Sequence, residues 1–271
     1  MQYAVVDSEP EVTAGCIDSA AALWPDVIGN LKDQELADVK AKMRTMRPVM
    51  NSTWEFLVAV RLLATDTDVT ELQRNWSSAC HQALKEWGTS ERQVEEHSQK
   101  FRKQRVAGNE EAFIENNKLY SGVADAVAQC QYPWYVITSR AKDRTLKLLK
   151  GLLSQNWPED TPRLYAGLSP PNERKIAAIR DIAQRPLVTE NKACLHFVDD
   201  RFETVQAVLE ARDLRGINLK VYLADWGYNT EDEREAAEKM SGLLTINLKQ
   251  FAELMQWGMV MGVDDGCGDD N

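Results

Sequence analysis

Apolar residues follow two different spacings along the chain. Between Thr13 and Asn117 they recur every three or four positions and no stretch alternates as a strand does, so this part is expected to be helical. The four clearest helices are predicted at Leu31–Arg47, Val49–Ala64, Val69–Trp87 and Ser90–Val106, with Pro48 as a first-turn residue of the second. The pattern therefore predicts an all-helical domain over residues 13–118.

From Tyr120 onward, short apolar runs alternate with amphipathic segments. Strands are predicted at Trp134–Thr138, Arg163–Gly167, Cys194–Asp199, Leu219–Ala224 and Leu243–Asn247. Helices are predicted between them at Lys142–Leu153, Glu173–Ala183, Phe202–Ala211 and Glu231–Met240. This alternation predicts an α/β domain over residues 119–257, with a mainly parallel sheet covered by helices on both faces. The run Gln2–Val6 could supply one more strand within residues 1–12, and residues 258–271 are expected to form an acidic, frayed tail.

Composition narrows the classes of function. The net charge of -10 disfavours nucleic acid as a partner, because phosphate binding needs a basic surface. No apolar run approaches the roughly 20 residues that cross a bilayer, and the first ten residues do not resemble a signal peptide. The five cysteines are scattered, as is typical of reduced thiols. We expect an intracellular, cytoplasmic protein, with a plastid as the alternative if a targeting segment is missing. The oligomeric state is not predicted.

Polar residues that could carry chemistry stand at the predicted strand ends. Thr138, Asp199 and Asp200 close two strands, Asp7 closes the run after Gln2, and Lys175 lies near the start of a helix. Because ligands on parallel sheets bind outside the carboxyl ends of the strands, these positions are expected to converge on one edge.

The adjacent carboxylates of Asp199 and Asp200 would repel one another unless a cation or a proton intervened. Mg²⁺ typically takes one or two carboxylates together with phosphate oxygens and water, so both residues are candidate Mg²⁺ ligands. A purely structural alternative exists for Asp200, because Glu203 follows three positions later in a capping-box pattern.

Lys175 is expected in the first turn of its helix, where a cation opposes the helix dipole. A bound phosphate would reverse that penalty, although a surface position is the usual role of a helical lysine. Thr138 is a candidate phosphate ligand, and it could equally cap a helix that starts near Ala141.

Three segments, in this order, resemble the second, third and fourth motifs of the haloacid dehalogenase-like (HAD) hydrolase superfamily. They read YVITSR, NERKIAAI and HFVDDR, and LYSGVADAV resembles the usual approach to the second motif. The chain is also similar to a plant, algal and cyanobacterial subfamily of HAD-like hydrolases through WPD, MRPVMNSTWEFLVAVRLL, LHFVDDRFET and LADWGYNTEDER. The resemblance covers nearly the whole chain.

The resemblance implies a Rossmann-like HAD core with an inserted all-helical cap, and a Mg²⁺-dependent phosphohydrolase that forms an aspartyl-phosphate. The substrate class it implies is a small phosphorylated metabolite. Thr138 and Lys175 inherit the role of holding the phosphoryl oxygens, and Asp199 and Asp200 that of holding the metal ion. Three further residues are expected to face the substrate, namely Arg47, Glu55 and Ser139.

The first motif departs from the HAD pattern, because the chain reads MQYAVVDSEPEV where two aspartates separated by one residue are usual. In one register Gln2 falls on the acid/base position and the nucleophile would precede residue 1. In the other, Asp7 ends the first strand and is the candidate nucleophile, with Glu9 as substitute acid/base. A weakly active phosphohydrolase and a catalytically silent protein that binds a phosphorylated ligand or a protein partner therefore remain alternatives, and a dehalogenase fits less well.

Overall fold

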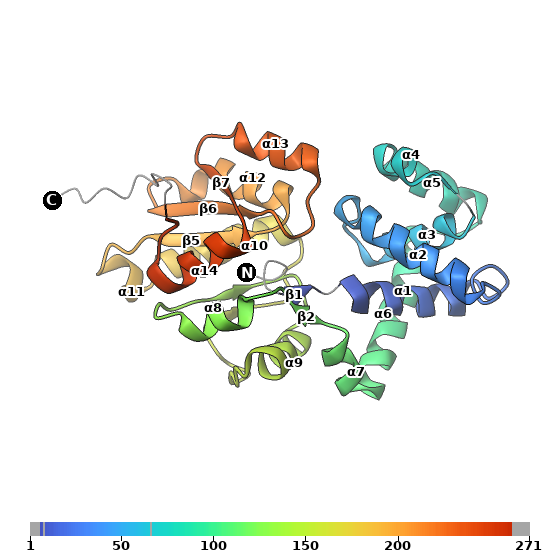
Figure 1. The fold of residues 1–271 in the computed structure, drawn as a ribbon, viewed down its shortest axis with the longest axis horizontal. Coiled ribbons are helices and arrows are strands. Elements are labelled where there is room, and N and C mark those ends of the chain that lie inside the picture. The colour runs from blue at the N-terminus through green and yellow to red at the C-terminus, as the bar shows by residue number, and fades with distance from the viewer. Residues whose placement is uncertain (1–5, 8, 66, 262–271) are drawn as a thin grey trace. The chain divides into compact units, whose positions relative to one another are not determined.

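A computed structural model describes residues 6–7, 9–65 and 67–261 of the chain. The chain divides into two compact units, one comprising Ser8–Asn117 and the other Met1–Asp7 with Lys118–Asn271. The first unit is helical and the second is α/β in the residues described (Figure 1). An α/β class with small parallel sheets is thereby established.

The helical unit is a bundle arranged around one buried helix. Its α-helices are α1 (Glu9–Leu23), α2 (Asp33–Met46), α3 (Thr53–Leu63), α4 (Val69–Arg74), α5 (Trp76–Glu86), α6 (Glu91–Gly108) and α7 (Glu110–Glu115). Helix α3 contacts α1, α2, α5 and α6, and its sequence TWEFLVAVRLL is apolar on nearly every side. A helix of that kind is stable only inside a protein, and Leu57, Val58 and Val60 are fully buried.

All four predicted helices of this unit differ in their bounds from the structure, and two of them differ substantially. The prediction of a helix from Val49 with Pro48 in its first turn was wrong: Arg47–Val49 is a separate 3-10 turn (η1) and α3 begins at Thr53. Ser52 and Glu55 form a capping box there, which satisfies the free amides of the first turn. The predicted helix from Val69 to Trp87 is interrupted at Asn75, whose backbone leaves the helical region.

The α/β unit follows the predicted alternation of strands and helices. Its strands are β1 (Val6–Asp7), β2 (Lys118–Leu119), β3 (Val136–Ile137), β4 (Leu164–Tyr165), β5 (Leu195–Asp199), β6 (Leu219–Ala224) and β7 (Leu243–Ile246). Its helices are α8 (Val123–Gln129), α9 (Lys142–Leu153), α10 (Pro171–Ala183), α11 (Pro186–Thr189), α12 (Phe202–Glu210), α13 (Glu231–Glu238) and α14 (Leu248–Trp257), with a 3-10 turn η2 (Arg212–Leu214).

The described strands form three small sheets. Strands β5, β6 and β7 are parallel in that order, β3 and β4 form a parallel pair, and β1 pairs antiparallel with β2. The antiparallel β1–β2 pair was not predicted. The run Gln2–Val6, which was predicted as a strand, lies outside the described residues except for Val6.

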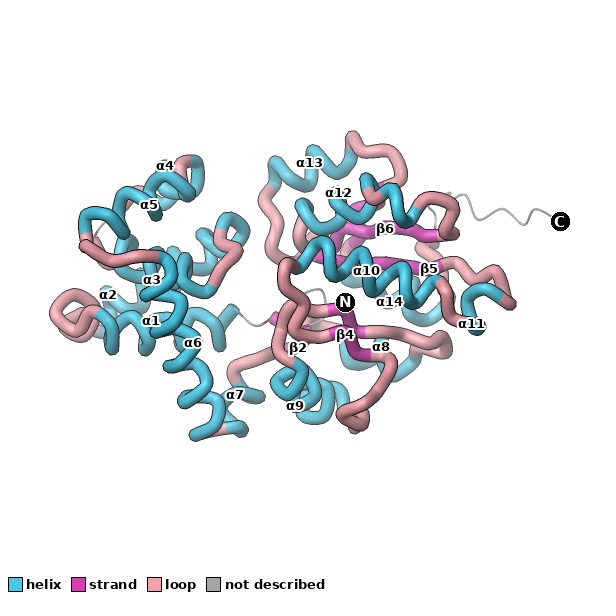
Figure 2. Tube along the Cα trace, turned by 180° about the vertical axis from the view of Figure 1, so that it is seen from behind, coloured by secondary structure: helices cyan, strands magenta, loops and turns pink. Residues whose placement is uncertain are grey.

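Alternating side chains of the three-stranded sheet fill two separate cores. Phe197, Val221 and Leu223 pack with α10 and α12 on one face. Val198 and Tyr222 pack with α8 and α14 on the other, as Figures 1 and 2 show from opposite sides. Because both faces are covered, the strands are mainly apolar, and β5 ends at its carboxyl end in the acidic Asp199.

Candidate functional site

The centre of the candidate site is a buried ion pair between Lys175 and Asp199. Nζ of Lys175 lies 2.6 Å from Oδ2 of Asp199, and each side chain is only 4% exposed. Helix α10 provides the lysine, and the carboxyl end of β5 provides the aspartate. Burial of two charges is tolerated because each neutralises the other at hydrogen-bonding distance.

The helix that carries Lys175 begins earlier than predicted. Pro170 precedes its first turn, so Lys175 is the fifth residue of α10 and lies beyond the first turn. The expected penalty from the helix dipole is correspondingly smaller, because that effect fades after one turn. The alternative of an ordinary surface lysine is excluded, since the side chain is buried.

Lys175 also changes the argument for a metal ion at the two aspartates. Repulsion between Asp199 and Asp200 is relieved by a nearby cation or a proton, and the ammonium group of Lys175 provides a cation. The second carboxylate oxygen of Asp199 accepts a hydrogen bond from the amide of Arg201 at 3.1 Å. Repulsion alone therefore no longer demands Mg²⁺.

Asp200 is held by the loop that follows β6 rather than by its own helix. Helix α12 has Arg201 as its N-cap, so the capping box predicted for Asp200 and Glu203 was wrong. Oδ2 of Asp200 instead accepts a hydrogen bond from the amide of Tyr228 at 2.8 Å. Gly227 makes this approach possible, because a Cβ there would lie 2.2 Å from Cβ of Asp200.

Asn229 locks the same loop to the ends of two strands. Its side-chain amide donates to the carbonyl oxygens of Asp200 and Ala224, at 2.9 and 2.8 Å. Arg234 in turn donates to both oxygens of Asn229. The sequence WGYNT, noted above only as part of a resemblance, thus contains the residues that fix Asp200.

Asp225 is a further acid at this edge that sequence reasoning missed. It follows directly after β6, and burial raises the pKa of its carboxyl group above the usual value, with Arg234 opposing the shift. Its position at the end of the LKVYLA run was the available signal.

Thr138 is completely buried just past the end of β3. Its hydroxyl accepts a hydrogen bond from the amide of Arg140 at 3.0 Å, and its backbone pairs with Tyr165 and Leu168. Ala141 is the N-cap of α9, so the alternative role of Thr138 as a helix cap was wrong. Ser139, the next residue, is exposed.

Arg47 and Glu55 make internal contacts in the helical unit. The buried guanidinium of Arg47 donates to the carbonyl of Met50 and lies 4.8 Å from the ring centre of Phe56. The Glu55 carboxylate accepts from the amide of Ser52 and from the indole N–H of Trp76. These contacts stabilise the unit, and a role of either residue in substrate binding stays a prediction.

Asp7 lies in β1, where it pairs with Lys118. Its side chain is outside the described part of the structure, as are those of Gln2 and Glu9. The structure therefore brings together Lys175 and Asp199 directly, and it fixes Asp200 at the same strand end.

The carboxylates of Asp199 and Asp200 have the hard oxygen donors that Mg²⁺ prefers. Among the described residues, no group of three or more His, Cys, Asp or Glu side chains could hold a metal ion. Mg²⁺ needs only one or two protein carboxylates when phosphate and water complete its shell, so the two aspartates fit it chemically.

No family model, curated protein or solved structure matches the chain. Within the part of the chain that the structure describes, no helix combines the length and apolarity needed to cross a membrane.

Proposed function

We propose that the protein is a HAD-type, Mg²⁺-dependent phosphohydrolase that acts on a small phosphorylated metabolite. The observation that carries the proposal is the buried Lys175–Asp199 pair at the end of a parallel strand, where such folds bind ligands. A buried ammonium group beside a carboxylate is costly to maintain, because both charges lose their hydration.

Each residue has a defined task under this proposal. Lys175 and Thr138 hold the phosphoryl oxygens and offset their negative charge. Asp7 attacks phosphorus and the bond between phosphorus and the ester oxygen breaks, with Glu9, the substitute acid/base, giving its proton to the leaving oxygen. Glu9 then takes a proton from the water that hydrolyses the aspartyl-phosphate and releases phosphate. Asp199 and Asp200 would hold Mg²⁺, which supplies neutralisation of charge on the phosphoryl group when bound. The helical unit would select the substrate.

The second candidate is a protein that binds a phosphorylated ligand without hydrolysing it. It is favoured by the contacts of Asp199, whose two oxygens already accept hydrogen bonds from Lys175 and Arg201. The departure of the first motif from the HAD pattern points the same way, because the acid/base carboxylate would be missing or one methylene longer, and displacements of about 1 Å can cost roughly 10²-fold in rate.

Phosphate release from a panel of phosphomonoesters, with and without Mg²⁺, distinguishes the two candidates. The phosphohydrolase is expected to release phosphate only with Mg²⁺, and Asp7→Asn should abolish release. Asp213→Asn, at an exposed position of the same unit, is the matched control and should keep full activity. Absence of release by the wild type at high enzyme concentration, together with saturable phosphomonoester binding, would favour the silent protein instead.

A further inference from the structure

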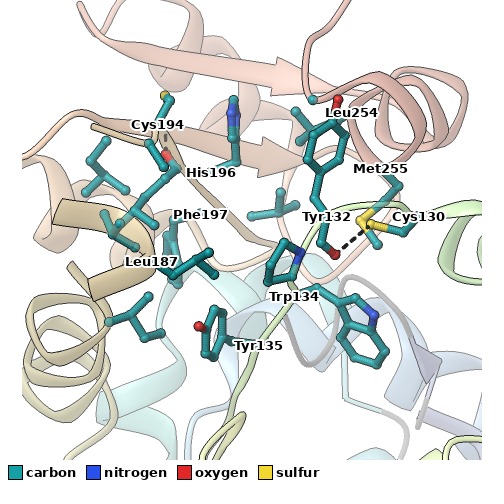
Figure 3. Close-up of a pocket in the computed structure, with 18 of the residues that line it drawn as sticks. Cys130, Tyr132, Trp134, Tyr135, Leu187, Cys194, His196, Phe197, Leu254 and Met255 are labelled. Atoms are coloured by element: carbon teal, nitrogen blue, oxygen red, sulfur yellow. Dashed lines mark hydrogen bonds between the residues drawn. The ribbon is translucent and has the colours of Figure 1, made fainter. Parts of the chain in front are cut away.

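The apolar cavity of the α/β unit is distinct from the acidic end of β5. It has a volume of about 460 Å³, and Tyr135 and the residues from Leu195 to Val198 of β5 are in its lining (Figure 3). Among the described residues that line it there is no Asp, Glu, Lys or Arg, so it lacks the charges that a phosphoryl group or a metal ion needs. On β5 the lining stops at Val198, one residue before Asp199. A charged ligand is therefore expected at the strand end.

At that strand end, the buried side chain of Asn229 joins two neighbouring parallel strands. Asp200 follows the last residue of β5, and Ala224 is the last residue of β6. The amide group of Asn229 donates to the carbonyl oxygens of both, at 2.9 and 2.8 Å. Because Asn229 is buried, water competes little for these two hydrogen bonds.

Arg234 determines which way the side-chain amide of Asn229 points. Nη1 of Arg234 donates to Oδ1 of Asn229 at 3.0 Å and to its backbone carbonyl oxygen at 3.2 Å. Since the oxygen of the amide faces a donor, its NH2 group faces the carbonyl oxygens of the strand ends. Arg234 lies on α13, whose first turn is fixed by the capping box of Thr230 and Glu233.

The contacts continue to the carboxylate of Asp200. The main chain of Asp200 is held by Asn229, and the amide of the preceding residue, Tyr228, donates to Oδ2 of Asp200 at 2.8 Å. A displacement of Asn229 would therefore move both the backbone of Asp200 and the donor that orients its carboxylate.

We propose that Asn229 and Arg234 are positioning residues for Asp200, and that through them helix α13 sets the affinity of this strand end for Mg²⁺. The inference rests on the proposed function, because it takes Asp200 as a ligand of the metal ion. Groups that orient a metal ligand typically change metal affinity by roughly 10–100-fold when they are removed.

Asn229→Asp tests this role with a side chain of the same shape. The new carboxylate keeps an acceptor for Arg234 but loses the donor for the carbonyl oxygens of Asp200 and Ala224. It also adds a negative charge, which by Coulomb attraction alone would strengthen Mg²⁺ binding. Positioning predicts the opposite sign, a Mg²⁺ dissociation constant raised by about tenfold or more in calorimetric titration with Mg²⁺ alone.

Asn191→Asp is the matched control for this substitution. Asn191 donates to the carbonyl oxygen of Leu187 at 2.8 Å, and it precedes β5, so it lies at the end of that strand opposite Asp200. The control makes the same chemical change in the same unit, but at an exposed and distant position. Its Mg²⁺ affinity should stay within about twofold of the wild type, because exposed distant charges are screened.

Arg234→Met tests the second step and does not depend on the folding of the Asn229 variant. It removes the donor to Asn229 together with a cation, so charge alone again predicts tighter Mg²⁺ binding and positioning predicts weaker binding. If Arg234 acts through Asn229, the double variant should bind Mg²⁺ no more weakly than Asn229→Asp alone. Arg215→Met, which removes an exposed cation near the start of β6, is the control and should leave the affinity unchanged.

Amide exchange provides a readout that needs no metal ion. The amide of Tyr228, which donates to Asp200, should exchange faster in both variants than in the wild type. The amide of Asp225, which donates to the carbonyl oxygen of Ile246, should be unchanged. Urea unfolding establishes that each variant is folded, and if Asn229→Asp does not fold, Arg234→Met decides.

The outcomes separate this inference from the proposed function. Absence of Mg²⁺ binding by the wild type would overturn both the metal role of Asp200 and the positioning role built on it. If the wild type binds Mg²⁺ and the folded variants bind it equally well or more tightly, only the positioning role of Asn229 and Arg234 is overturned. An equal loss of affinity in the two control variants would also overturn it.

Discussion

Lys175 and Asp199 join helix α10 to the end of strand β5 through one buried contact, with Nζ 2.6 Å from Oδ2. A second ion pair on the same helix, between Arg180 and Asp213, has a similar distance of 2.7 Å but side chains that are 46% and 60% exposed. The two pairs allow the effect of burial to be separated from that of distance.

Removal of one partner of the buried pair should be strongly destabilising. Lys175→Met leaves the carboxylate of Asp199 buried without its cation, and we expect a loss of about 3–5 kcal/mol in the free energy of unfolding. Arg180→Ala, the control on the exposed pair, should cost about 0–1 kcal/mol. Urea unfolding measures both. The variants Lys175→Met, Asp199→Leu and their combination complete a double-mutant cycle. If the loss of stability in the double variant equals the sum of the losses in the two single variants, the two residues do not interact as a pair.

Gly227→Ala should disturb the loop that fixes Asp200. The added methyl group would lie 2.2 Å from Cβ of Asp200, so the loop must move and the hydrogen bond from Tyr228 must lengthen. Overpacking of this kind costs roughly 1–3 kcal/mol. Amide exchange at Tyr228 and urea unfolding measure the effect. Gly108→Ala, where a Cβ would meet no atom within 4 Å, is the control, and equal effects of the two substitutions would contradict the close contact.

Glu55→Ala distinguishes a structural role from a substrate-binding role. The substitution removes the capping box of α3 and leaves the indole N–H of the buried Trp76 without its acceptor, so about 1–3 kcal/mol of stability should be lost. Thermal unfolding measures this loss. Glu86→Ala, at an exposed position of α5, should change stability by less than about 0.5 kcal/mol. If the Glu55→Ala variant is as stable as the wild type but no longer binds substrate, Glu55 faces the substrate and its structural role is contradicted.

Asp225 should make the stability of the protein depend on pH. Burial raises the pKa of its carboxyl group in the folded state, so the folded protein holds that proton more tightly than the unfolded chain does. The contribution is fully present below the unfolded pKa of about 3.9 and is lost as pH rises through the higher folded value. Asp225→Asn should therefore increase stability near neutral pH and flatten the profile in that window. Urea midpoints measured from pH 3.5 upward would contradict this if both proteins gave parallel curves.

Much of the α/β unit could be predicted from the periodicity of apolar residues. The predicted helix Lys142–Leu153 and strand Leu219–Ala224 are confirmed with identical bounds. In each, the apolar residues form one uninterrupted pattern and are buried in the folded protein. The strand predicted over Trp134–Thr138 is only two residues long in β3, because regular pairing depends on neighbouring strands that local sequence does not specify.

The candidate site was predictable at the level of residue types but not of contacts. Polar residues that end apolar runs identified Asp199 and Asp200, whereas the pairing of Lys175 with Asp199 depends on how α10 packs against β5. The hydrogen bond from Tyr228 to Asp200 joins residues 28 positions apart and requires the loop conformation that Gly227 permits. Sequence patterns do not encode such a distance.

The antiparallel pair formed by β1 and β2 holds together the two points where the chain leaves and re-enters the α/β unit, at Asp7 and Lys118. Since those residues already face each other, a tight hairpin turn could bridge them with the whole helical segment excised. The helical unit is thus an insertion whose two ends are held side by side, so replacing it with a loop of a few residues should cost little loop-closure entropy.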